Sequence, residues 1–113
     1  MIEPTTDTVF DSDSVQDPRR LLSTYEFRLG ALAQRITIRL YWNISKHKVE
    51  FEQGHFLRSP AQFGLYTPDA PYTNNEEDAL RTALKPFKAF YEYAVREGYE
   101  PDETWLVTNE SFG

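Results

Sequence analysis

Cysteine is absent from this chain of 113 residues. Without thiols the protein has no disulfide bonds, no thiol nucleophile and no cysteine-ligated metal, and a cytoplasmic location fits this composition. Residues 1–17 carry five acids and no base, the opposite of the basic start of a secretory signal. No apolar run approaches the roughly 20 residues of a membrane span. We therefore expect a soluble, cytoplasmic protein that makes no membrane contact.

Glycine is scarce, and the short motifs of common enzymes are missing. The five glycines stand singly, and there is no glycine-rich phosphate loop, nucleophile elbow or paired-histidine zinc motif. His47 and His55 stand near opposite ends of one predicted strand with no third ligand nearby, which is not a metal-site spacing. Glu50 and Glu52 would lie about 6.6–7 Å apart on one strand face, as every Glu-x-Glu strand places them. We expect neither an enzyme nor a cofactor or metal site.

Bases are missing from both ends of the chain, whose formal net charge is −6. Residues 1–17 and residues 97–113 each hold five acids and no base, whereas residues 18–58 hold eight bases against three acids. The acidic ends can fold back on the basic middle and neutralise it. The net negative charge makes nucleic acid an unfavourable partner.

The length allows one domain, and the composition favours a packed core. Hydrophobic residues make up 40% of the chain and aromatic residues 15%, and each buried ring removes about 150–250 Å² from water. Residues 1–16 are rich in Thr, Asp and Ser and predict a disordered acidic arm. Residues 17–113 predict a single α+β domain.

Three segments alternate apolar and polar residues with the period of a β-strand. They are residues 24–31, residues 35–43, where the alternation is cleanest, and residues 48–53. Their short connections predict an antiparallel meander with one buried and one solvated face. Residues 56–57 are expected to resume pairing after Gly54, which suggests a bulge or the end of the third strand.

The remaining segments give weaker signals. Asp17 followed by Pro18 is a helix-start signal and predicts one or two helical turns over residues 19–23. Residues 59–73 contain three prolines and form a long connection in which residues 63–66 could add a short edge strand. Residues 105–108 are a further strand candidate, so the sheet would have three to four strands.

A sustained helical period occurs in one place, residues 74–98. Thr73 with Glu76, and Asn74 with Glu77, form two overlapping capping boxes at its start. Gly98 suits its end. Pro86 interrupts the pattern, so either one helix kinks there or Pro86 separates two helices. The apolar stripe of this helix should pack against the sheet, and its members are Leu80, Ala83, Leu84, Phe87, Tyr91, Ala94 and Val95.

Several large side chains fall outside that stripe, and one sheet face cannot cover all of them. A residue next to Tyr91 points about 100° away from it, and the tail after Gly98 mixes acids with large apolar residues, which suits docking on a basic partner. The competing interpretation is that these rings simply complete the core. The candidate protein-binding residues are Phe90, Tyr93, Tyr99, Glu103 and Trp105.

We therefore expect a small, non-catalytic binding module that acts through protein–protein contact as a regulatory, adaptor or inhibitor protein. A homodimer is one form that this contact can take. The alternative is nucleotide or nucleic-acid binding on the open sheet face, where Arg28, Arg39 and Tyr41 could hold an anion or stack a base. A third interpretation is an acidic inhibitor that mimics nucleic acid.

Overall fold

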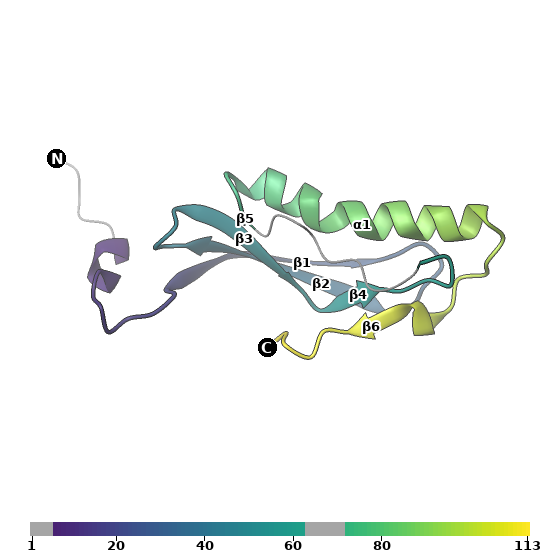
Figure 1. Cartoon of the computed structure of the whole chain (residues 1–113), viewed down its shortest axis with the longest axis horizontal. Coiled ribbons are helices and arrows are strands. Elements are labelled where there is room, and N and C mark those ends of the chain that lie inside the picture. The colour runs from purple at the N-terminus through teal and green to yellow at the C-terminus, as the bar shows by residue number, and fades with distance from the viewer. Residues whose placement is uncertain (1–5, 63–71) are drawn as a thin grey trace.

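The computed structural model describes residues 6–62 and 72–113. One long helix lies along one face of an antiparallel sheet (Figure 1), which confirms the expected α+β fold. The four-stranded sheet has the order β1-β2-β3-β5, and β4 pairs with β6 in a second, two-stranded sheet. The elements are the 3-10 helix η1 (Thr6–Phe10), β1 (Arg19–Arg28), β2 (Arg35–Asn43), β3 (Lys48–Gln53), β4 (His55–Leu57), β5 (Tyr72–Thr73), α1 (Glu76–Arg96), the 3-10 helix η2 (Glu103–Trp105) and β6 (Leu106–Thr108).

The central strands β2 and β3 occupy the residues that alternation predicts, 35–43 and 48–53. Ile36, Ile38 and Leu40 are fully buried beneath α1, because every second residue of a strand points to the same face. The intervening residues of β2 point to the other face of the sheet. This arrangement explains why a single alternation pattern specified both the strand and its buried side.

The first strand begins earlier than expected. β1 starts at Arg19 and pairs with β2 over its whole length, so the predicted helical turns over residues 19–23 are wrong. Asp17 has a positive φ of 49° and does not cap a helix, and the carbonyl oxygen of Pro18 accepts a hydrogen bond from the Ile44 N–H at 3.0 Å. Sheet pairing over a long sequence separation therefore overrides the local helix-start signal. Leu22 forms a bulge, because it has no partner in β2.

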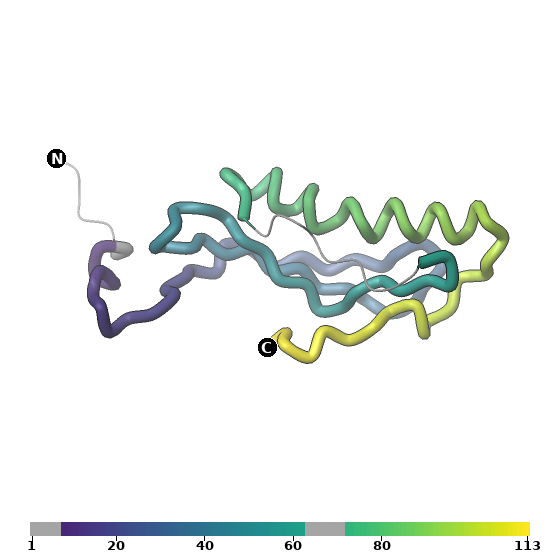
Figure 2. Tube along the Cα trace, in the orientation of Figure 1, coloured from purple at the N-terminus to yellow at the C-terminus, as the bar shows by residue number. Residues whose placement is uncertain are grey.

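The helix α1 is one continuous element through Pro86, as the tube in Figure 2 also shows. Its N-cap is Asn75, whose side-chain oxygen accepts the Asp78 N–H at 2.8 Å. The predicted capping boxes are therefore wrong, since the Thr73 hydroxyl donates instead to the backbone oxygen of Asn75 at 2.9 Å. At the other end Gly98 has a φ of 94° and forms the expected left-handed stop.

The chain changes its pairing partner at Gly54. The Gly54 N–H still donates to the Thr37 oxygen of β2, but the Gly54 oxygen accepts the N–H of Asn109 from the C-terminal segment. Beyond this point β4 pairs with β6 and not with the meander. The expected strand at 105–108 is thus present as β6, with Trp105 at the end of η2. The expected edge strand at 63–66 lies outside the described residues.

The apolar core has two parts. One cluster contains Ile38, Leu40 and Val49 from the sheet with Ala79 and Ala83 from the first half of α1. The other contains residues from the second half of α1 and from the C-terminal segment, and its buried members are Leu29, Leu32, Ile36, Leu57, Phe87, Ala94, Trp105 and Leu106.

The molecule is elongated, with extents of 59 × 27 × 23 Å and a radius of gyration of 16.9 Å. A compact chain of this length would have a radius of gyration of about 13 Å. The 3-10 helix η1 lies at one end of the long axis, beyond the sheet (Figure 1). Within the described ranges, the helices include no stretch with the length and apolar character needed to span a lipid bilayer.

Candidate protein-binding surface

The open face of the sheet is held together by its own charges. The Arg19 guanidinium lies 2.6 Å from a Glu52 oxygen and 3.3 Å from a Glu50 oxygen, and it stacks 3.8 Å from the centre of the Tyr41 ring. Partial burial lowers the pKa of Arg19, but the hydrogen bonds with the two carboxylates raise it overall. The basic and acidic side chains at this end of the face thus neutralise one another within the chain.

The residues of the predicted anion site do not converge. The Arg39 guanidinium lies 4.1 Å from the centre of the Phe112 ring and donates a hydrogen bond to the backbone oxygen of Gly113. Tyr41 is covered by Arg19. Arg28 stands at the far end of β1, where its partner in the register is Arg35. Two of the three predicted residues are therefore engaged within the chain.

The predicted protein-binding residues are also divided. Trp105 is only 3% exposed and meets the Tyr91 ring edge-on at 6.0 Å, and Phe90 packs against the same core cluster. Tyr93 and Tyr99 remain exposed at 40% and 44%. Trp105 is therefore part of the core, which was the competing interpretation of these rings.

Glu103 has a structural task in this fold. Its carboxylate accepts the backbone N–H of Ala33 at 3.0 Å and the N–H of Gln34 at 2.9 Å. These bonds tie the connection between β1 and β2 to η2, about 70 residues later in the chain. The Glu103 carboxylate therefore holds the β1–β2 connection of its own chain.

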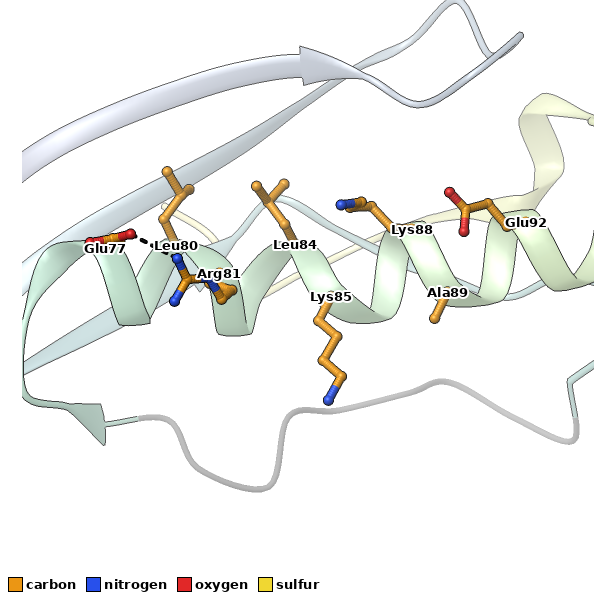
Figure 3. Close-up of a pocket in the computed structure, with 8 residues that line it drawn as sticks. All are labelled: Glu77, Leu80, Arg81, Leu84, Lys85, Lys88, Ala89 and Glu92. Carbon is orange, nitrogen blue, oxygen red and sulfur yellow. Dashed lines mark hydrogen bonds and ion pairs between the residues drawn. The ribbon is translucent and has the colours of Figure 1, made fainter.

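A cavity of about 490 Å³ runs along α1, within the range of small-molecule sites. Figure 3 shows that its lining does not converge, because Leu80 and Leu84 point to one side of the helix and Lys85 and Ala89 to the other. Arg81 is already paired with Glu77 at 2.7 Å. A second cavity of about 580 Å³ lies between η1, the segment that follows it and the β2–β3 turn. Neither cavity brings together groups that suggest a reaction.

His55 is the titratable side chain of β4, and it is half-buried. Burial lowers its pKa below the ordinary value of 6.5, and its Nε2 lies 2.9 Å from the Gln34 side-chain nitrogen. Its Nδ1 is buried without a hydrogen-bond partner. His47 is exposed at the opposite end of β3, and the two histidines do not form a site. Across residues 6–62 and 72–113, no group of three or more His, Cys, Asp or Glu side chains is arranged to hold a metal ion.

The feature that the sequence pattern did not reveal is the open edge of β1. In the described part of the chain β1 has one hydrogen-bonded neighbour, β2, and so forms one edge of the four-stranded sheet. It is ten residues long, and seven of these residues are exposed. Leu21 and Tyr25 are 53% and 41% exposed. The opposite edge strand, β5, has only two residues.

An edge strand of this length presents roughly 33 Å of backbone. Its outward N–H and C=O groups are available to a strand of another chain. Alternation identifies a strand but not its place in the sheet, so the edge position had no signal in the sequence. The sequence feature that comes nearest to such a signal is the polar composition of β1, which has Ser23, Thr24 and Glu26 in its middle.

No protein-family model, curated protein or solved structure matches this chain. Function is therefore inferred from the geometry.

Proposed function

We propose that this protein is a small, non-catalytic protein-binding module of the cytoplasm, acting as a regulatory, adaptor or inhibitor protein. The observation that carries the proposal is the open, ten-residue edge of β1. A partner segment can add to such an edge as a further strand, with backbone hydrogen bonds providing affinity and alternate side chains providing specificity. The absence of cysteine from the sequence supports the cytoplasmic location.

The side chains along β1 fit this role. Leu21 and Tyr25 point to opposite faces of the sheet, since Leu21 lies opposite Tyr41 on the open face and Tyr25 lies opposite the buried Ile38. An added strand would therefore meet an exposed apolar side chain on each face. On the open face, Arg19 of β1 pairs with Glu50 and Glu52 of β3, and Arg39 of β2 contacts the Phe112 ring. Within the described chain the outer backbone edge of β1 has no strand paired with it.

A photo-crosslinking amino acid placed at single positions tests the proposal in the native host. Tyr25 and Leu21 report on the β1 edge, and Tyr93 and Tyr99 report on the exposed rings near the end of α1. We expect discrete protein adducts from the two β1 positions. Adducts from Tyr93 or Tyr99 alone would move the binding surface to α1, and the absence of protein adducts at all four positions would refute the proposal.

A second candidate function, anion or nucleic-acid binding, is favoured by one observation. Arg28 and Arg35 lie directly opposite each other in the register, and like charges in this position destabilise a sheet by roughly 0.2–1 kcal/mol unless an anion bridges them. Titration with single-stranded RNA at low salt is the test. Binding that Arg28→Ala weakens and Arg58→Ala does not would support it, and no binding at low salt would exclude it.

A further inference from the structure

We infer that the strand added to β1 comes from a second copy of this chain, in an inference that rests on the proposed function. The two copies would pair β1 with β1 in antiparallel fashion about a twofold axis perpendicular to the sheet. Two four-stranded sheets would become one continuous sheet with both α1 helices on the same face. A twofold contact requires a surface that is complementary to itself, and β1 meets this requirement.

The bulge defines the positions along the strand. Leu21 lies opposite Tyr41 and Ser23 lies opposite Leu40, so Leu22 and Ser23 together occupy one position. Residues directly opposite each other in an antiparallel pair must point to the same face. The open-face residues of β1 are Arg19, Leu21, Thr24, Glu26 and Arg28, because their partners in β2 point to that face.

Charge selects one register among those that the faces allow. With the axis at the bulge, Arg19 lies opposite Glu26 of the second copy, and Leu21 lies opposite Thr24 of the second copy. Arg19 also pairs with Glu50 and Glu52 of its own copy, so Glu26 would join an existing cluster of charges. By symmetry each of these pairs occurs twice, so two Arg19–Glu26 pairs of opposite charge form on the open face.

The adjacent registers are unfavourable. An axis at Thr24 would place Arg19 opposite Arg28 of the second copy. An axis at Leu21 would leave Glu26 beyond the end of β1 of the second copy, so no opposite charges would meet. Like charges directly opposite each other destabilise strand pairing. In addition, the side chains of Glu26 and Arg28 make no hydrogen bond or ion pair within the described chain, so both side chains are available to a second copy.

The oligomeric state of the full chain tests the inference. Sedimentation equilibrium over a wide concentration range should find a dimer for the wild type. Glu26→Arg should weaken association by about tenfold or more, because it replaces two attractive pairs by two repulsive ones. Glu92→Arg, an identical charge change on the exposed side of α1, is the matched control and should leave the dimer unchanged. A wild type that stays monomeric, or a dimer that Glu26→Arg does not weaken, would overturn the inference.

The register is tested with introduced cysteines, which have no native thiol to compete with them. Mixing the Leu21→Cys and Thr24→Cys variants under mild oxidation should give a covalent dimer of the two variants. Opposite Cα atoms in an antiparallel pair lie about 4.5–5.5 Å apart, within the disulfide range. The control mixture of Leu21→Cys with Glu26→Cys should not cross-link. Equal cross-linking in both mixtures would reject this register.

Failure of this inference and failure of the proposed function give different results. If the isolated chain is monomeric but the crosslinker at Tyr25 still captures a different protein, the inference is overturned and the proposed function stands. If the chain is monomeric and no protein adduct forms at any position, both are overturned.

Discussion

Replacing Gly30 by alanine should lower the stability of this protein by a large amount. Gly30 has a positive φ of 53°, and an added Cβ would lie 2.2 Å from Cζ and from Oη of Tyr91. That ring cannot yield freely. Its Oη accepts the Ala31 N–H at 2.8 Å, and its edge meets the Trp105 ring at 6.0 Å.

The expected cost has three parts. The left-handed backbone costs an L-residue about 1–2 kcal/mol. Displacing the Tyr91 ring loses a hydrogen bond that contributes about 0.5–1.5 kcal/mol and an aromatic pair of about 0.5–1.5 kcal/mol. Gly30→Ala should therefore lower the free energy of unfolding by about 2–5 kcal/mol, a large share of the roughly 5–15 kcal/mol that stabilises a domain.

Urea denaturation followed by circular dichroism measures this cost, and the chain contains its own control. Gly98 also has a positive φ, of 94°, but an added Cβ would meet no atom within 4 Å. Gly98→Ala should therefore show the backbone cost alone. In a Tyr91→Ala background, Gly30→Ala should likewise lose most of its excess cost, because the ring is gone. Equal effects of Gly30→Ala and Gly98→Ala would refute the reasoning.

Three further changes have expected outcomes. Asn75→Ala should lower the free energy of unfolding by about 1 kcal/mol through loss of the helix N-cap, whereas Asn74→Ala should leave the cap intact, and urea denaturation separates them. Burial lowers the pKa of His55, so the unfolded chain binds a proton more readily, and the free energy of unfolding should fall as the pH drops through about 6.5. His55→Gln should reduce this loss, which urea denaturation at about pH 7.5 and at about pH 5.5 measures; an equal loss in the wild type and the variant would contradict this account. Glu103→Ala frees two backbone N–H groups and should cost about 1–2 kcal/mol, measured in the same way; a variant as stable as the wild type would show that the loop does not need this carboxylate.

Local patterns were sufficient for the central elements. Alternation identified β2 and β3 at their correct bounds, because both strands bury one face under α1 and polar residues occupy the other. The left-handed stop at Gly98 was likewise visible, since glycine is the residue that this backbone conformation favours. These features depend on neighbours within a few residues.

Features that depend on distant partners were missed or misjudged. The start of β1 at Arg19 is set by pairing with Asn43, and no local rule registers that contact. From the sequence, Trp105 was predicted to be a candidate protein-binding residue in an acidic tail, but it is buried against Tyr91. The proposed binding edge itself follows from the strand order, which alternation does not contain.

The division of the core into two clusters has a consequence for biosynthesis. The cluster around Ile38 and Leu40 draws its members from residues 22–84, so all of them are made before residues 105 and 106. The cluster around Phe87 needs Trp105 and Leu106, which leave the ribosome later. A chain without Trp105 and Leu106 would expose Phe87 and Leu57, which pack against them, as apolar surface. Such surface is what chaperones and proteases bind, so Trp105 and Leu106 protect this half of the core once they are made.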